Sequence, residues 1–323
     1  MDLKALVGLP KKLVMAGEEA NEEERMAERK IRPTTWDDYV PNGNEPEVMR
    51  RWLEGAKRHE EQPDHLLISG PPGTGKTVLS NLVAQDFNHH VKVYAGKGSS
   101  DIISELYTVQ EHPGMAVFMD EIHAMDKIAT ESVQLAMEGN LYRRMKPWTL
   151  IGATTKPGRI EQPIRDRFGL IQEMSYYTED KIALIATKSA AKLNMELQPL
   201  AAEEIGSRSR GVPRVANRLL RRVRDVYDSP TPRQVDEALV ELGIDSWGLE
   251  KADRGLILLM ATRFKGGPVG LKTLAGAFGT EPTTIVEVFE PYLIRKGLID
   301  IVPRGRQLTP VGFKYAKEVL KRG

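Results

Sequence analysis

Five short apolar runs alternate with amphipathic stretches over residues 32–175. Each run is four or five residues long and is followed by polar, glycine or proline positions, which is typical of strands buried in a parallel sheet. The stretches between the runs have the apolar spacing of helices. The pattern predicts an α/β domain with a parallel sheet. Its strands are placed at Leu66–Ser69, Val91–Tyr94, Met115–Met119, Thr149–Ala153 and Leu170–Met174.

The pattern changes twice farther along the chain. Residues 178–243 keep helical periodicity and lose the strand-like runs, which predicts a helical domain. Residues 248–320 hold two or three helical stretches and then two short strand candidates, Leu298–Val302 and Gln307–Thr309, with a turn at 303–306. That order is the outline of a winged helix. We therefore expect an N-terminal extension (1–31), an α/β domain (32–176), a small helical domain (177–246) and a winged helix (247–323).

The most specific motif follows the first predicted strand. The residues Gly70-Pro71-Pro72-Gly73-Thr74-Gly75-Lys76-Thr77 match the P-loop pattern G-x-x-x-x-G-K-[ST] in full. A strand enters this loop and a helix leaves it, so backbone N–H groups and a helix N-terminus point at an anion. We expect Lys76 to reach the β- and γ-phosphates and Thr77 to bind Mg²⁺. The sequence therefore predicts a nucleoside triphosphate, ATP, with Mg²⁺.

Two carboxylates end the third predicted strand. Asp120 and Glu121 follow an apolar run and lie 44 and 45 residues after Lys76. In this context Asp120 is expected to hold Mg²⁺ through water, and Glu121 to polarise the water that attacks the nucleotide. The neighbouring His123 is interpreted as a structural or interface residue.

Polar residues also end the fourth predicted strand. Strand C-termini line the ligand crevice of parallel sheets, so Thr155, or Thr154, is a candidate sensor of the γ-phosphate. Taken alone, the position favours an ordinary threonine at a strand end.

Three further sites carry arginines. Arg167 cannot easily reach the P-loop of its own chain, but in a ring it could reach a neighbour's nucleotide as an arginine finger; a surface salt bridge is the alternative. Arg214 opens a helix in the helical domain and could fold onto the nucleotide. Arg304 and Arg306 occupy the predicted wing turn, where they either contact DNA phosphates or form only a basic turn.

Composition narrows the class of protein. The chain has 323 residues, a net charge of +1 and no cysteine, which excludes disulfides and cysteine-based sites. Residues 247–323 carry 13 Lys and Arg against 7 Asp and Glu, so the charge is concentrated in the winged helix. A basic end domain favours a polyanion partner. No apolar stretch approaches the ~20 residues that span a bilayer, and we expect a cytoplasmic protein without a signal peptide.

Together these residues resemble the AAA+ ATPases and, more closely, the RuvB family of Holliday-junction motors. The similarity covers about residues 24–315. It rests on the P-loop, on Asp120-Glu121-Ile122-His123, on Gly152-Ala153-Thr154-Thr155, on Arg165-Asp166-Arg167-Phe168-Gly169, on Pro213-Arg214 with residues 216–225, and on three winged-helix strings: Gly266–Leu271, Glu290–Leu293 and Pro303–Arg306. The resemblance implies a parallel-sheet ATPase domain, a helical lid and a winged helix. It also implies that Arg32 and Tyr39 contact the adenine, that Thr155 is sensor 1, and that Arg167 is the finger.

The chain departs from the family between the second carboxylate motif and sensor 1. There the family has a long β-hairpin that contacts the RuvA partner. Here Leu141–Met145 is too short for two strands of about five residues and a turn. We therefore expect a divergent member that does not dock on RuvA in the family's manner.

The leading hypothesis is an ATP-driven motor on the duplex arms of branched DNA, working as a homo-oligomeric ring, by resemblance a hexamer, with no membrane partner. Two alternatives remain open. One is a helicase- or clamp-loader-type ATPase that remodels a protein on DNA. Slow ATP turnover and strong dependence on a partner protein would favour it over the motor. The other is an ATP-gated DNA-binding module, against which the intact Glu121 and Arg167 argue.

Overall fold

The computed structural model describes residues 30–87, 90–94, 99–109, 112–139 and 146–322. The chain divides into two compact units between Arg221 and Arg222, inside helix α10. The domain boundaries expected at residues 176 and 246 differ from this division and stay predictions.

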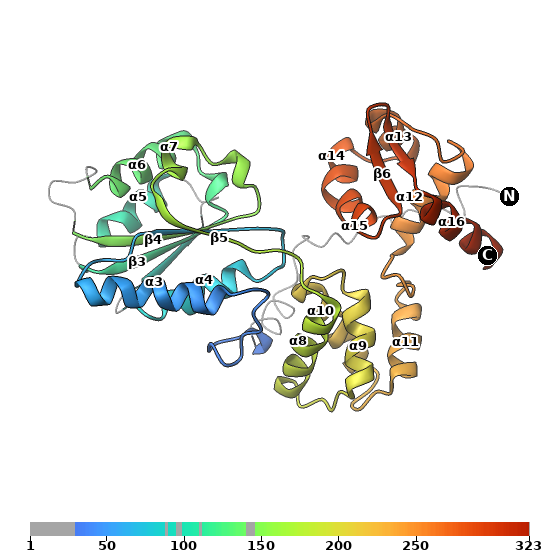
Figure 1. Ribbon diagram of the computed structural model, residues 1–323, viewed down its shortest axis with the longest axis horizontal. Coiled ribbons are helices and arrows are strands. Elements are labelled where there is room, and N and C mark those ends of the chain that lie inside the picture. Colours follow the sequence, from blue (N-terminus) through green and yellow to red (C-terminus); the bar gives the residue numbers. More distant parts are fainter. Residues whose placement is uncertain (1–29, 88–89, 95–98, 110–111, 140–145, 323) are drawn as a thin grey trace. The chain divides into compact units, whose positions relative to one another are not determined.

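The first unit is built on a five-stranded parallel sheet with the strand order β2-β3-β4-β1-β5. Helices cover both of its faces (Figure 1). All five expected strands are confirmed, with ends shifted by one or two residues. The elements are α3 (Glu45–His59), β1 (His65–Ser69), α4 (Lys76–Ala84), β2 (His90–Tyr94), α5 (Ser99–Thr108), β3 (Met115–Asp120), η1 (Ile122–Ala124), α6 (Lys127–Met137), β4 (Trp148–Thr154), η2 (Pro157–Arg159), α7 (Gln162–Arg165) and β5 (Phe168–Glu173).

Alternation along the strands creates two cores. On β3, Val117 and Met119 pack into one hydrophobic cluster with α5 and α6, while Ala116 and Phe118 pack into the cluster on the opposite face with α4. Successive strand side chains point to opposite faces, so a strand covered on both sides is apolar throughout. The burial fixes the sheet, and with it the positions of the polar residues at the strand ends.

Three helices that follow the sheet form the lid: α8 (Glu179–Lys192), α9 (Pro199–Arg208) and α10 (Pro213–Arg224). Helices α8 and α9 approach closely at Gly206, where an added Cβ would lie 2.6 Å from the carbonyl oxygen of Glu179. A glycine is needed at this crossing because any side chain would push the two helices apart.

The second unit holds α11 (Pro232–Glu241) and the winged helix. The winged-helix elements are α12 (Lys251–Thr262), α13 (Leu271–Phe278), α14 (Pro282–Thr284), η3 (Ile285–Phe289), α15 (Glu290–Arg295), β6 (Ile299–Val302), β7 (Gly305–Leu308) and α16 (Pro310–Arg322). The expected helix from residue 283 to 296 is found, but its middle turn, η3, is a π-turn. Pro291 explains the irregularity, because it lacks the N–H that an α-helix needs at that position.

The wing differs from the sequence prediction. The expected four-residue turn at 303–306 is wrong: the turn is the pair Pro303-Arg304, and β7 begins at Gly305. Gly305 has φ of 132°, and a Cβ there would lie 2.1 Å from the carbonyl oxygen of Val269. Arg306 exchanges two backbone hydrogen bonds with Val269, 2.8 and 2.9 Å long. This added pairing draws residues 305 and 306 into the sheet.

Candidate nucleotide site

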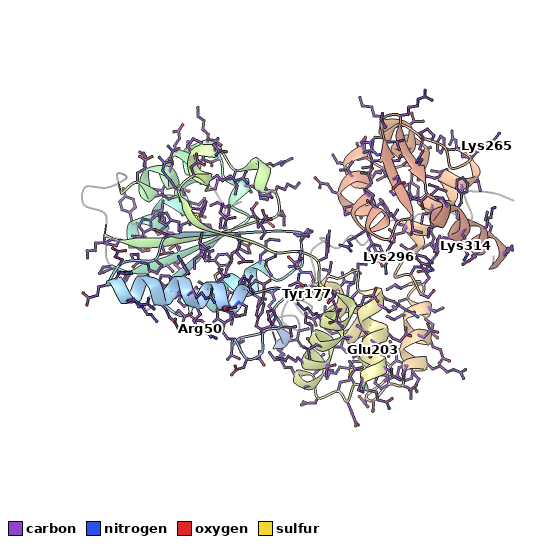
Figure 2. All side chains as sticks on the ribbon, viewed as in Figure 1. Arg50, Tyr177, Glu203, Lys265, Lys296 and Lys314 are labelled. Atoms are coloured by element: carbon purple, nitrogen blue, oxygen red, sulfur yellow. The ribbon has the colours of Figure 1, made fainter. Side chains whose placement is uncertain are left out.

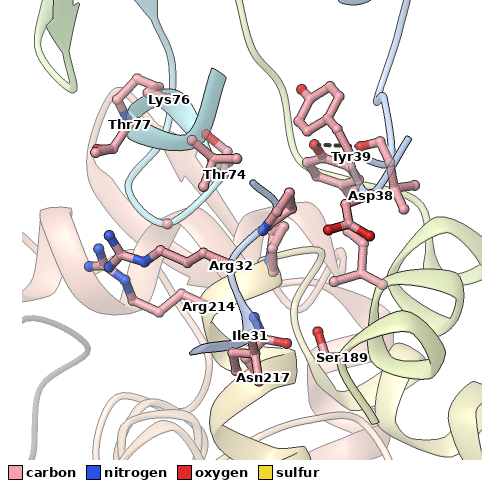
Figure 3. Close-up of a pocket in the computed structure, with 18 of the residues that line it drawn as sticks. Ile31, Arg32, Asp38, Tyr39, Thr74, Lys76, Thr77, Ser189, Arg214 and Asn217 are labelled. Atoms are coloured by element: carbon pink, nitrogen blue, oxygen red, sulfur yellow. Dashed lines mark hydrogen bonds between the residues drawn. The ribbon is translucent and has the colours of Figure 1, made fainter. Parts of the chain in front are cut away.

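The first unit contains a cavity of about 240 Å³ at the carboxyl end of the sheet (Figure 3). Five parts of the chain meet around it: the P-loop, the ends of β3 and β4, the leading segment (residues 31–42), helix α8 and the start of α10. The cavity is lined by Ile31, Arg32, Pro33, Asp38, Tyr39, Val40, Pro72, Gly73, Thr74, Gly75, Lys76, Thr77, Val78, Asp120, Glu121, Thr155, Tyr177, Ile185, Lys188, Ser189, Lys192, Pro213, Arg214 and Asn217.

The P-loop wraps tightly between β1 and α4. Gly73 has φ of 77°, and a Cβ there would lie 2.7 Å from Cγ1 of Val212, so this glycine is required both by its backbone angle and by contact with the lid. Lys76 Nζ donates to the carbonyl oxygens of Gly70 and Pro71 at 2.9 and 2.8 Å. Burial lowers the pKa of Lys76, and the nearby carboxylates Glu121 and Asp120 oppose that shift. The loop therefore holds a buried amino group where a phosphate would arrive.

Thr77 and Asp120 form the one pairing in the cavity suited to a divalent cation. Thr77 Oγ1 donates to Asp120 Oδ2 at 3.0 Å, so a hydroxyl and a carboxylate oxygen converge at the phosphate end of the cavity. Hard oxygen ligands of this kind, few in number and completed by water and phosphate, are the coordination that Mg²⁺ prefers. Within the described residues there is no group of three or more His, Cys, Asp or Glu that could hold a metal by themselves. The residues therefore fit Mg²⁺ bound together with a nucleotide.

Glu121 faces the cavity beside Asp120. Its side chain is 45% exposed, and its backbone is left-handed, with φ of 53° and ψ of 46°. Glu121 Oε2 accepts hydrogen bonds from the backbone N–H and the hydroxyl of Thr155, at 3.2 and 3.0 Å. The structure thus brings the expected sensor threonine onto the expected catalytic carboxylate.

The leading segment closes the other end of the cavity. Tyr39 is 6% exposed and packs edge-on against Trp36, with ring centroids 6.1 Å apart. Burial raises the pKa of its hydroxyl above the usual range. Arg32 lines the cavity as well. Aromatic and aliphatic walls at the end opposite the P-loop suit a flat base.

Lysines of helix α8 tie the lid to this leading segment. Lys192 Nζ lies 2.8 Å from Asp38 Oδ2 and donates to the carbonyl oxygen of Arg32 at 3.0 Å. Lys188 donates to the carbonyl oxygen of Asp37 at 2.6 Å. The lid and the segment therefore form one continuous wall of the cavity.

Arg214 connects the lid to the P-loop. Its backbone N–H donates to the carbonyl oxygen of Gly73 at 3.4 Å, and its side chain lines the cavity. Figure 3 shows the side chains of Arg32, from the leading segment, and of Arg214, from the start of α10, extending in the same direction. A cation delivered by a movable lid can report the charge of the nucleotide.

Arg167 does not line the cavity. Its guanidinium contacts Glu138, at the end of α6, and the carbonyl oxygen of Pro163, and its side chain is 28% exposed. The sequence argument that this arginine does not act on its own P-loop is compatible with that position.

The two wing arginines have different surroundings. Arg304 is exposed at the turn. Arg306 Nε lies 2.6 Å from Glu290 Oε1, and the two side chains are only 16% and 4% exposed. Arg306 is therefore held in a buried ion pair within the second unit, away from the wing tip where the sequence placed it. Lys265 and Lys314 extend into solvent from the same unit (Figure 2).

Sequence reasoning anticipated Arg214 of the lid but missed the contribution of helix α8 to the cavity. Ile185, Lys188, Ser189 and Lys192 come from α8, more than 100 residues after Lys76. No short motif marks them. Their spacing of three and four residues identifies one helical face, but only the packed lid shows what that face covers.

These features define a P-loop ATPase of the AAA+ class. A parallel sheet carries the phosphate loop, the Asp-Glu pair and a threonine that contacts the glutamate, and a helical lid lines the same cavity. Three family profiles match the chain. They are the Holliday junction DNA helicase RuvB P-loop domain over residues 31–143, the RuvB AAA lid domain over 177–250 and the RuvB C-terminal winged helix domain over 246–317.

Full-length relatives agree. The Holliday junction branch migration complex subunit RuvB of Lacticaseibacillus casei is 37% identical, with 94% of this chain and 95% of the relative covered. Its counterpart from Crocosphaera subtropica is 40% identical, with 92% and 90% covered. The solved Thermotoga maritima RuvB Holliday junction branch migration motor has a TM-score of 0.80 and 35% identity, covering 89% of this chain and 98% of that one. The chain belongs to the RuvB family, which confirms the fold class and the resemblance.

Proposed function

We propose that this protein is an ATP-driven motor that moves the branch point of Holliday junctions in recombination and repair. The observation that carries the proposal is the cavity, which joins Lys76, the Thr77–Asp120 pair, the Glu121–Thr155 pair and lid residue Arg214 in one unit. Because the Glu121 carboxylate is held in place beside the nucleotide site, where it can activate water, the site can support hydrolysis of ATP as well as its binding.

The roles of the residues follow from their positions. The N–H groups of the P-loop and Lys76 hold the β- and γ-phosphates. In the structure, the Lys76 amino group donates to two carbonyl oxygens of the loop, and phosphate oxygens take the place of these acceptors when ATP binds. Thr77 and Asp120 would hold Mg²⁺, whose charge neutralises the phosphates. Glu121 orients the attacking water and accepts its proton, while Thr155 links that carboxylate to the γ-phosphate. Arg32, Tyr39 and the face of α8 enclose the base and ribose.

The remaining roles need a second subunit and DNA. We infer that subunits assemble into a ring, in which Arg167 leaves Glu138 and acts on the neighbour's γ-phosphate. Movement of the lid through Arg214 would drive the winged helix. Arg304 is the wing residue available to phosphates; Arg306, in its buried pair, supports the wing instead. Phosphate contacts bind without reading sequence, which suits a translocating motor.

Whether a RuvA-type partner loads this motor is a separate question. Helix α6 ends at Met137 and β4 begins at Trp148. The expectation of a missing hairpin concerns residues 141–145, which lie outside the described part of the chain. We retain it as a proposal that the protein does not use the family's RuvA contact.

The test is steady-state ATP turnover by the purified protein, without DNA, with duplex DNA and with four-way junction DNA, each with and without RuvA. Lys76→Ala is the blank. Stimulation by junction DNA with migration of the branch point is the expected result. A protein that turns over ATP without ever moving the branch would refute the motor and favour a remodelling ATPase. Stimulation that requires RuvA would refute the proposed independence alone.

A further inference from the structure

His123 lies closer to the catalytic carboxylate than its place in the sequence indicated. It belongs to the 3₁₀ turn η1, immediately after β3. The left-handed backbone of Glu121 reverses the chain at this point, and the N–H of Ala124 closes the turn on the carbonyl oxygen of Glu121 at 2.8 Å. This brings the side chain of residue 123 back alongside that of residue 121. The imidazole is 12% exposed and therefore has little freedom to turn away.

Three contacts converge on a single oxygen of Glu121. His123 Nδ1 lies 3.2 Å from Oε2, and the same oxygen accepts from the N–H and the hydroxyl of Thr155. No described residue makes a hydrogen bond to the other oxygen, Oε1. The contacts therefore hold the carboxylate through Oε2, and Oε1 is available to a ligand in the cavity.

The surroundings of His123 select which nitrogen carries the proton. Nδ1 is also 2.9 Å from Thr154 Oγ1, and that hydroxyl oxygen accepts the N–H of Lys156 at 3.0 Å. A lone pair on Nδ1 would face the negative carboxylate at 3.2 Å, whereas a proton there faces the carboxylate favourably while Nδ1 keeps its hydrogen bond with the Thr154 hydroxyl. Electrostatics at Oε2 therefore favours a proton on Nδ1, and burial lowers the pKa of His123, which favours the neutral ring.

We propose that His123 is a positioning residue for ATP hydrolysis: together with Thr155 it fixes the Glu121 carboxylate so that Oε1 meets the attacking water. The inference rests on the proposed function, since it takes Glu121 as the group that activates water. A half-exposed carboxylate held by fewer contacts would spread over several rotamers, and a catalytic group that is out of place by about 1 Å loses much of its rate advantage.

The experiment compares His123→Ala with His123→Asn. The asparagine Nδ2 stands in the same place along the side chain as the imidazole Nδ1 and can donate to Oε2. For each variant, kcat and KM for ATP are measured, together with the Kd of a fluorescent ATP analogue and the melting temperature. His59→Ala, at the exposed end of α3, is the matched control and should equal the wild type.

We expect His123→Ala to lower kcat by about tenfold or more, because the close contact that holds the carboxylate in place is lost. The Kd should stay within about twofold of the wild type, and His123→Asn should recover most of kcat. In a Glu121→Gln background, His123→Ala should cause no further loss, since the two residues act as one unit.

Three results would overturn the inference. Turnover by His123→Ala at the wild-type rate would remove the positioning role. Equal losses in the alanine and asparagine variants, accompanied by a lower melting temperature, would show that the ring serves only to fill space. A rise in Kd without a change in kcat would move its role to ATP binding. Full turnover by Glu121→Gln would instead refute the role that the proposed function gives to Glu121, so the two failures are distinguishable.

Discussion

The buried ion pair of the winged helix offers a sharp test of how the structure assigns Arg306. Glu290 begins α15, and Arg306 lies on β7; their side chains meet at 2.6 Å between Oε1 and Nε, with a second approach of 3.4 Å between Oε2 and Nη2. Both side chains are largely buried. Replacing Glu290 by glutamine keeps the volume but removes the charge, and turns an amide NH₂ toward the guanidinium.

The cost follows from leaving a cation without its counterion. Removing one partner of a buried pair typically costs about 3–5 kcal/mol. Arg306 is 16% exposed, and glutamine still offers one acceptor oxygen, so we expect a loss of about 2–3 kcal/mol in the free energy of unfolding. For a unit of about 100 residues this corresponds to a fall of roughly 10–20 °C in melting temperature.

Hydrogen exchange measured by mass spectrometry would follow the winged helix separately from the first unit. Peptides from α12, β6 and α16 report its opening, and urea titration gives the free energy. Glu318→Gln, which changes an exposed carboxylate on α16 of the same unit, is the control and should change stability by less than about 0.5 kcal/mol. The double variant Glu290→Gln/Arg306→Met should lose less than the sum of the two single variants.

A loss below about 0.5 kcal/mol for Glu290→Gln would refute the argument. It would mean that Arg306 is solvated in solution and free to contact DNA, as the sequence alone indicated. A large loss of stability in Glu290→Gln, with an unchanged affinity for junction DNA at low temperature, would indicate that Arg306 stabilises the wing and does not contact DNA.

Three further predictions concern other parts of the chain. Burial lowers the pKa of His65 to about 4, and its Nδ1 accepts the N–H of Leu150 at 2.9 Å. The stability that this neutral ring provides is complete above its unfolded pKa of about 6.5 and falls by up to about 3 kcal/mol as the pH drops to 4. Urea titrations at several pH values should show that the free energy of unfolding depends less steeply on pH in His65→Gln than in the wild type. An equal pH dependence would contradict the assignment of His65 as a buried neutral ring. Gly312→Ala would place a Cβ 2.0 Å from the carbonyl oxygen of Leu298, and should destabilise the winged helix by about 1–3 kcal/mol; an unchanged melting temperature would count against the packing described. Arg304→Gln should weaken DNA binding equally for all sequences and lower the salt dependence of log K by about one, measured by fluorescence anisotropy; an unchanged salt slope would exclude a phosphate contact at the wing tip.

Much of the fold could be predicted because its signals are local. The two-residue alternation on β3, between Val117 and Met119 on one face and Phe118 on the other, is what a strand buried on both sides requires. The P-loop could be recognised for a similar reason: glycines with positive φ and a lysine at fixed spacing are demanded by the turn and by the phosphate, not by distant contacts.

The structure differs from the sequence prediction where backbone or side chains from another element make contact. The wing turn is shorter than expected because Val269 pairs with Arg306, 37 residues later. The assignment of Arg306 changed because Glu290, on another element, neutralises it. The sequence indicates only a structural or interface role for His123, because it does not show that a left-handed Glu121 brings the imidazole back beside the carboxylate.

The sequence by itself determined the elements and the phosphate chemistry: the strands, the P-loop with Lys76, and the Asp120-Glu121 pair. Only the tertiary structure decided which strands are neighbours, that α8 and the leading segment close the cavity, and which arginine remains exposed on the wing. The physical reason is that a local pattern reports the burial and backbone angles of a few adjacent residues. Contacts across 40 to 160 positions, such as Thr77 with Asp120 or Lys192 with Arg32, exist only once the layers have packed.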